Sequence, residues 1–124
     1  MLNNVNKGKV AETTAICYLN LRYSIIDYNY STRYGEIDVI CLDYEANEVV
    51  FVEVKSTSYL NTLAAVELFT TRKLQKLMRT LQMWLASTKI FANFSYRIDL
   101  IALDMNYYHY SVKALKQYKN IGNF

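Results

Sequence analysis

Three charged side chains stand inside two β-branched, apolar stretches of the sequence. Asp38 lies within Glu36–Leu42, and Glu53 and Lys55 lie within Val49–Lys55. Alternate side chains of a strand share a face, so Glu53 and Lys55 would point the same way, about 6.6–7 Å apart. Asp38 can stand opposite them on a neighbouring strand. Burying such groups is costly unless they are paired or bind a cation, which makes this arrangement a candidate cation site.

The same alternation predicts the neighbours of Asp38. Glu36 is expected on the face of Asp38, so that three or four charged groups converge on one side of an otherwise apolar sheet. The opposite face is expected to carry Ile37, Val39 and Cys41. Spacing alone fits a second interpretation equally well, in which this face is open to water and Asp38 is a cross-strand neighbour of Lys55.

The elements that must position these residues follow from periodicity. Apolar residues recur at helical spacing in Val10–Leu21 and Thr71–Ser87, and strands are predicted at Tyr23–Tyr30 and Tyr96–Leu103. A hairpin joins the two charged stretches through the turn at residues 43–47. Val112–Tyr118 is predicted as a short C-terminal helix with its lysines outward. This order predicts an α/β fold with a central mixed β-sheet flanked by α-helices.

Length and composition fit one domain over residues 1–124, with 52% apolar and 20% charged residues. No signal-peptide core or membrane-spanning run is found, so a cytoplasmic protein is expected, with Cys17 and Cys41 as buried free thiols. Residues 1–60 hold five basic and eight acidic side chains (5 − 8 = −3), and residues 61–124 hold nine basic and three acidic (9 − 3 = +6). An acidic site would thus face a basic platform that suits a polyanion, although solvated helix faces give the same counts.

The two charged stretches resemble a known family. Gly35–Ile40, followed after a turn by Val50–Lys55, looks like the motif of the YraN-like family of small uncharacterised bacterial proteins. That family is placed with the PD-(D/E)xK nucleases and is similar to archaeal Holliday junction resolvases. Weaker matches extend the resemblance over a core of residues 7–103, leaving residues 104–124 as a tail. They include Gly8, Glu12, Ala15, Arg72, Lys73 and Arg97–Asp99. The resemblance implies a restriction-endonuclease-like fold.

The resemblance also implies roles for individual residues. Asp38 and Glu53 would be the metal-binding carboxylates, with the backbone carbonyl of Val54 as a further ligand of Mg²⁺ or Mn²⁺. Lys55, held beside two carboxylates, should stay protonated, orient the attacking water and stabilise transition-state charge. Glu12 would contact the metal waters or a second metal ion, with a solvated helix glutamate as the equal alternative. The implied activity is metal-dependent endonucleolytic cleavage of DNA, including branched or repair intermediates, by a monomer or homodimer.

Two departures from the family pattern keep rival functions open. Thr57 stands where an arginine usually follows the lysine, and Ala11 replaces a glycine before the helix glutamate. The first favours an alternative in which the chain is a nucleic-acid-binding or protein-interaction module with little or no catalysis. A third hypothesis is an assembly protein that uses the tyrosine-rich tail around residues 107–110.

A basic stripe on the second helix is the remaining candidate. Arg72, Lys76 and Arg79 fall at i, i+4 and i+7, opposite the leucines of the helix. A solvated face is the ordinary explanation of such a stripe. If the helix borders the cleft, these residues would contact phosphates without reading sequence, and Lys73 would lie near the site.

Overall fold

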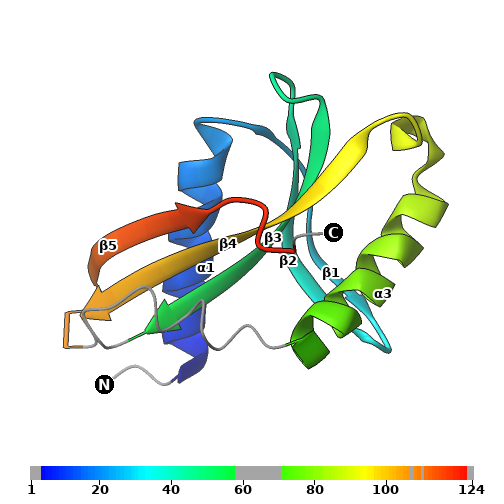
Figure 1. Ribbon diagram of the computed structural model, residues 1–124. Coiled ribbons are helices and arrows are strands. Elements are labelled where there is room, and N and C mark those ends of the chain that lie inside the picture. The colour runs from blue at the N-terminus through cyan, green and yellow to red at the C-terminus, as the bar shows by residue number, and fades with distance from the viewer. Residues whose placement is uncertain (1–3, 58–70, 107, 110, 123–124) are drawn as a thin grey trace.

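The computed structural model describes residues 4–57, 71–106, 108–109 and 111–122 (Figure 1). Its helices and strands are α1 (Asn4–Asn20), β1 (Ser24–Thr32), β2 (Gly35–Asp43), β3 (Glu48–Thr57), α3 (Thr71–Ser87), the 3-10 turn η1 (Lys89–Phe91), β4 (Ser95–Asn106) and β5 (Ser111–Tyr118). The five strands form one sheet in the order β1-β2-β3-β4-β5. Only β3 and β4 run parallel, and the other neighbours are antiparallel. The predicted mixed sheet flanked by helices is confirmed.

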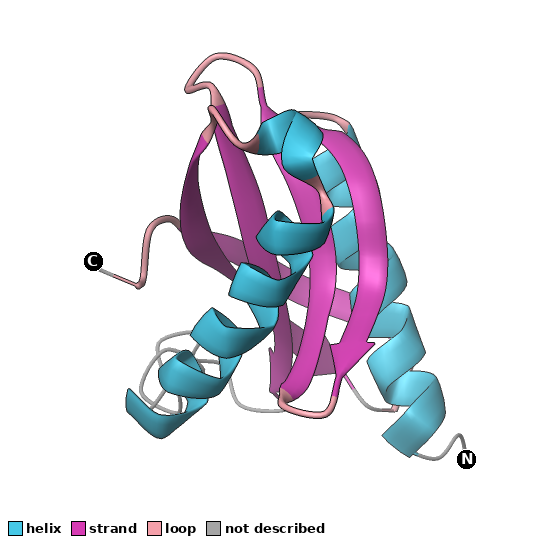
Figure 2. Ribbon diagram, turned by 90° about the vertical axis from the view of Figure 1, so that its right-hand side faces the viewer, coloured by secondary structure: helices cyan, strands magenta, loops and turns pink. Residues whose placement is uncertain are grey.

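The two long helices cover opposite faces of the sheet (Figure 2). On one face α1 buries Ala11, Ala15 and Leu19, whose spacing of four residues aligns them in one narrow stripe. The small side chains of this stripe allow α1 to lie close to the centre of the sheet. Cys41 is buried under it as predicted, but Cys17 is exposed because it lies outside the stripe.

On the other face α3 spans the predicted residues, Thr71–Ser87, and buries Leu77, Leu81 and Trp84. Trp84 meets the ring of Phe51 edge-on at 5.6 Å between centroids. This geometry is a favourable aromatic contact. It anchors the C-terminal half of α3 over β3, and the N-terminal half of the helix continues toward the charged residues of the sheet.

Strands β2 and β3 separate partway along their length. They pair from Asp43↔Glu48 to Val39↔Val52, whereas β3 continues with β4 as far as Thr57↔Asp104. In Figure 1 the β1–β2 hairpin extends toward α3, while the part of the sheet formed by β3, β4 and β5 extends to the opposite side. We call the point of separation, at Asp38 on β2 and Val54 on β3, the fork.

Side-chain alternation breaks at the fork. Val39 and Cys41 pack under α1 as expected, but Ile37 packs under α3, although it is two residues from Val39. The prediction that these three residues share a face is therefore wrong. On β1, opposite Asp38, Asn29 has a φ of 54°. This left-handed conformation is a local departure from strand geometry in β1.

The predicted C-terminal helix at Val112–Tyr118 is also wrong, because these residues form β5. Met105 pairs with Val112 and Asp104 with Ala114, so Lys113 is an extra, bulged residue. The bulge brings Val112 and Leu115 to the same face, where both pack against the α1-side core. A separation of three residues on one face is the spacing that predicted a helix.

No helix within the described ranges is long and apolar enough to cross a membrane.

Candidate functional site

Asp38 takes the place of a strand partner at the fork. Its Oδ2 accepts a hydrogen bond of 2.7 Å from the backbone N–H of Val54, beyond the last paired residues of β2 and β3. The N–H and C=O of one residue in a strand point toward the same side. The carbonyl of Val54 is therefore directed toward the side of Asp38, as its predicted role as a metal ligand requires.

Glu53 and Lys55 share the α3 face, as predicted. Both line a cavity of about 220 Å³ together with Lys73 and Lys76 of α3. This volume is below the ~300–1,000 Å³ of pockets for drug-sized ligands. The space suits a phosphate group with its surrounding waters better than a whole nucleoside.

Asp38 lies in a second, smaller cavity of about 130 Å³ on the α1 side, which Glu12, Val54 and Ser56 also line. The two carboxylates therefore approach the fork from different cavities rather than from one sheet face. They nevertheless interact, because the charge of Asp38 raises the pKa of Glu53. We refer to Asp38 and Glu53 as the carboxylate pair.

The environment of the carboxylate pair opposes two negative charges. Burial raises the pKa of Asp38 to about 6; the N–H of Val54 lowers it, and the charges of Glu12 and Glu36 raise it. Burial and the charge of Asp38 raise the pKa of Glu53 to about 8 against the opposing effect of Lys55. A cation between the two carboxylates would remove this repulsion.

The donor atoms of the fork fit a hard divalent cation. Within the described ranges no group of three His, Cys, Asp or Glu side chains could hold a metal ion. Mg²⁺ commonly takes only one or two protein carboxylates and completes its octahedron with other oxygens, including water and substrate phosphate. The carboxylate pair, the carbonyl of Val54 and added waters make up such a set.

Glu12 is close enough to the fork to act there, and one residue that the sequence did not single out holds it. With the amide of Asn29 oriented so that its nitrogen faces the carboxylates, it donates to Glu12 and, at 3.2 Å, to Glu36. Burial and the charge of Glu36 raise the pKa of Glu12, and the Asn29 amide lowers it. Asn29 lies near the end of the strand predicted at Tyr23–Tyr30, where no pattern marked it as a site residue.

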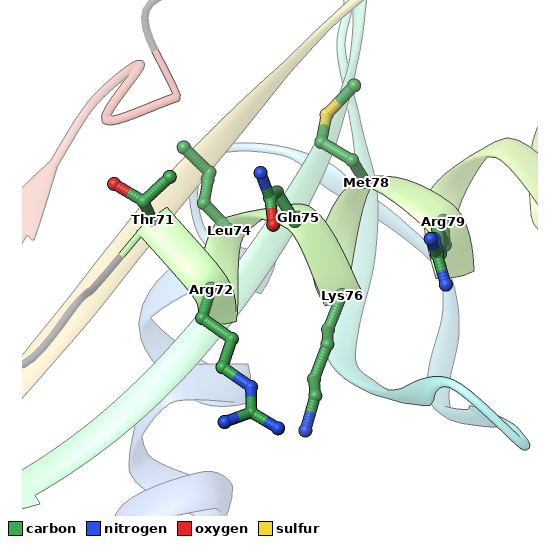
Figure 3. A pocket seen from close by; sticks show the side chains of 7 residues that line it. All are labelled: Thr71, Arg72, Leu74, Gln75, Lys76, Met78 and Arg79. Carbon is green, nitrogen blue, oxygen red and sulfur yellow. The ribbon is translucent and has the colours of Figure 1, made fainter.

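The basic stripe of α3 is exposed as predicted and borders the site. Arg72, Lys76 and Arg79 line a groove of about 670 Å³ along the helix. Figure 3 shows the side chains of Arg72 and Lys76 extending on the same side of α3, away from Leu74 and Met78. Lys76 lines both this groove and the Glu53 cavity. Lys73 lies at that cavity, where its charge lowers the pKa of Glu53.

A second group of charged residues, most of them buried, lies at the other end of β3. Arg97, 6% exposed, donates from Nε to Asp99 at 3.1 Å, and from Nη1 to Asp43 at 2.9 Å and Glu48 at 3.1 Å. Asp99 also accepts hydrogen bonds from the side chain of Gln117 and the N–H of Asn120. We call the four charged residues the arginine network. Sequence reasoning found only the strand that carries Arg97 and Asp99, because the partners are distant in sequence.

The tail offers less to a functional interpretation. Tyr108 is 93% exposed, while Tyr107 and Tyr110 lie outside the described residues. The hypothesis that the tail mediates assembly stays a prediction.

Comparison with known proteins gives a family and a distant structural likeness. The model of the uncharacterised protein family UPF0102 matches residues 11–103. A UPF0102 protein of Vibrio parahaemolyticus is 39% identical over 99 residues, covering 77% of this chain and 78% of the relative. One from Clostridium botulinum is 34% identical over 116 residues, covering 91% and 93%. The crystal structure of a repair endonuclease from Pyrococcus abyssi is similar with a TM-score of 0.39 and 21% identity, covering 77% of this chain and 38% of that one.

Proposed function

Since the chain belongs to the uncharacterised protein family UPF0102, the YraN-like family that its motif predicted, we propose its activity from its own site: metal-dependent hydrolysis of phosphodiester bonds in DNA. The observation that carries this proposal is the carboxylate pair at the fork. Two half-buried carboxylates that repel each other stand beside Lys55 and next to a basic helix. Such an arrangement costs stability unless a cation and a polyanion complete it.

Each residue of the fork has a distinct task in this proposal. Asp38, Glu53 and the carbonyl of Val54 would hold the cation, and the N–H of Val54 fixes the orientation of the Asp38 carboxylate. When bound, Mg²⁺ or Mn²⁺ polarises the phosphate and makes a coordinated water more acidic. Lys55, on the Glu53 side, would orient the water and stabilise negative charge that develops on the phosphate.

The basic residues of α3 would hold the substrate. Lys73 and Lys76 line the same cavity as Glu53, so a phosphate at the fork would lie between the carboxylate pair with its cation and these two ammonium groups. Their contact is with the backbone of the nucleic acid and carries no sequence information. This predicts cleavage that depends on the structure of the DNA more than on its sequence, with branched and repair intermediates among the substrates to be tried first.

The test compares single substitutions that preserve shape. Asp38→Asn, Glu53→Gln and Lys55→Met should each reduce cleavage of branched or linear DNA in Mg²⁺ or Mn²⁺ by about 100-fold or more. Glu45→Gln, at an exposed position in the β2–β3 turn, is the matched control and should cleave as wild type. Circular dichroism and thermal unfolding establish that all four variants fold. Cleavage retained in the three site variants would overturn the proposal.

A non-catalytic nucleic-acid-binding module is the second candidate. Thr57 in the place of the family's arginine favours it, as does a basic groove on α3 that extends away from the carboxylate pair. Binding that weakens steeply with salt, is unchanged by chelator and yields no product would support this candidate over the nuclease.

A further inference from the structure

The tip of the β1–β2 hairpin presents a second basic surface beside α3. Arg33 places its guanidinium carbon 4.9 Å from the centroid of the Tyr34 ring and donates from Nη2 to the Tyr34 hydroxyl at 2.7 Å. Arg79 of α3 lies 5.5 Å from the same centroid. One aromatic ring therefore contacts two guanidinium groups from different elements. Cation–π contacts of this length restrict where the guanidinium groups can lie.

The hairpin tip packs against α3. Thr80, which is buried in α3, approaches Thr32 with 3.4 Å between the two hydroxyl oxygens. A Cβ added at Gly35 would lie 3.6 Å from the same Thr80 oxygen, and Gly35 has a φ of +156°. The Thr32 hydroxyl also accepts a hydrogen bond from the N–H of Tyr34 at 3.1 Å. The distance between Arg33 and Arg79 is thus set by the packing of a hairpin on a helix.

This surface is continuous with the candidate site. Tyr34 lines the Glu53 cavity together with Lys55 and Lys76. Arg79 lies three residues beyond Lys76, which is about 4.5 Å further along the helix axis. A strand whose phosphate occupies the cavity would therefore reach the two arginines within one or two nucleotides.

We propose that Arg33 and Arg79, positioned by Tyr34, bind the phosphodiester backbone of the nucleic-acid strand next to the phosphate at the fork. The inference rests on the proposed function, since it takes the fork as the place of the reacting phosphate. Guanidinium groups bind phosphates in a bidentate manner, and two of them held at a fixed separation lose little entropy on binding. The Tyr34 ring already contacts both arginines, so it serves as a positioning residue and not as a platform for base stacking.

The experiment measures the salt dependence of binding, which reports the number of phosphate contacts. Full-length protein in Ca²⁺ is titrated with a labelled 20-nucleotide single strand and with the matching duplex, over a series of salt concentrations. Each phosphate contact contributes about 0.7 to the slope of log K against log salt for a single strand and about 0.9 for B-form DNA. Arg33→Ala combined with Arg79→Ala should reduce the slope by about 1.4 and 1.8, respectively.

Arg22→Ala combined with Lys89→Ala is the matched control. It removes the same charge from exposed positions elsewhere, and Arg22 also contacts a tyrosine ring, at 3.9 Å from the Tyr18 centroid. The control should retain the wild-type slope. An equal reduction in both double variants, no reduction in the first, or no binding by wild type would overturn the inference.

Tyr34→Leu tests the positioning role without changing charge. It should weaken binding about threefold to tenfold, while Tyr34→Phe, which keeps the ring, should weaken it less. Wild-type affinity in Tyr34→Leu would overturn the role of the ring. Binding with the expected slopes but without cleavage in Mg²⁺ or Mn²⁺ would overturn the proposed nuclease activity and support the binding surface.

Discussion

Two groups of charged residues occupy the two ends of β3, and the fold pairs them differently. The arginine network is largely buried, whereas the carboxylate pair is half-buried. The arginine network near Glu48 joins one guanidinium to three carboxylates within 3.1 Å. In the carboxylate pair near Lys55, Asp38 accepts a hydrogen bond from the backbone N–H of Val54. Buried charges that are well paired serve the structure, whereas carboxylates whose pKa values are raised by burial and by neighbouring carboxylates indicate a site that a ligand completes.

The ionisation of the two groups reflects this difference. Burial would raise the pKa of Asp43, but hydrogen bonds from Arg97 and the Ala46 N–H outweigh it and hold the pKa below its usual value. Burial lowers the pKa of Arg97, but its bonds to Asp99 and Asp43 raise it overall. In the carboxylate pair, burial and mutual repulsion act in the same direction. Substitutions at the two ends of β3 should therefore have opposite effects on stability.

The largest effect is expected in the arginine network. Arg97→Met would remove the guanidinium that pairs with Asp43 and Asp99 and would leave both carboxylates buried. Breaking a buried pair by removing one partner costs about 3–5 kcal/mol, so this variant should lose much of its free energy of unfolding. Urea unfolding at pH 7 measures the change. A loss below about 1 kcal/mol would mean that the network contributes little to the fold.

A substitution in the carboxylate pair should instead stabilise the fold. The pKa of Glu53 is raised from 4.5 to about 8, so ionisation of Glu53 destabilises the folded state. Below about pH 4.5 this cost is absent, and it grows until the pH exceeds the folded-state pKa. Without divalent cations, the free energy of unfolding of Glu53→Gln should therefore exceed that of wild type by about 1–3 kcal/mol at pH 8.5. At pH 5 the two should differ little. Urea unfolding in chelator at both pH values measures this, and a destabilised Glu53→Gln at pH 8.5 would contradict it.

Added metal ion should offset part of the destabilisation caused by the carboxylate pair. A ligand that binds only the folded state at ten times its Kd stabilises it by about 1.4 kcal/mol. Mg²⁺ or Mn²⁺ should raise the Tm of wild type and of Glu45→Gln by a few degrees and leave Asp38→Asn unchanged. Differential scanning fluorimetry over a metal titration measures the shift. An equal rise in Asp38→Asn would locate the binding elsewhere.

The smallest expected effect concerns Asn29, whose neutral amide donates hydrogen bonds to Glu12 and Glu36. Alanine and glycine both remove this amide, but only alanine is strained at a φ of 54°. Asn29→Ala should therefore be about 1 kcal/mol less stable than Asn29→Gly. Chemical unfolding of the two variants measures the difference, and equal stability would show that the backbone relaxes.

The sequence predicted those features that depend on neighbours along the chain. The heptad-like spacing of Leu77, Leu81 and Trp84 located α3, and alternation located β2 and β3 with Glu53 and Lys55 on one face. Asp38, Glu53, Lys55 and Glu12 line the two cavities at the fork, whereas Arg72 and Arg79 lie along α3. What these residues bind is still a prediction.

The features that the sequence did not predict depend on contacts between distant segments. Asp38 lines a different cavity from Glu53 because β2 separates from β3 at this point. No local sequence pattern indicates that separation. Asn29 reaches Glu12 across the gap between β1 and α1. The arginine network joins residues up to 54 positions apart. In each case the polar residue is ordinary in its own segment, and tertiary structure alone gives it a partner.

The bulge in β5 has a consequence for the sheet as a whole. As an outer strand of an open sheet, β5 presents backbone groups to which a strand from another molecule could pair. The extra residue at Lys113 distorts that edge, and the exposed Lys113 and Lys116 add charge beside it. Lysines and bulges on outer strands both discourage intermolecular pairing. The bulge that made β5 resemble a helix in the sequence thus also discourages aggregation of the folded protein by pairing at this outer strand.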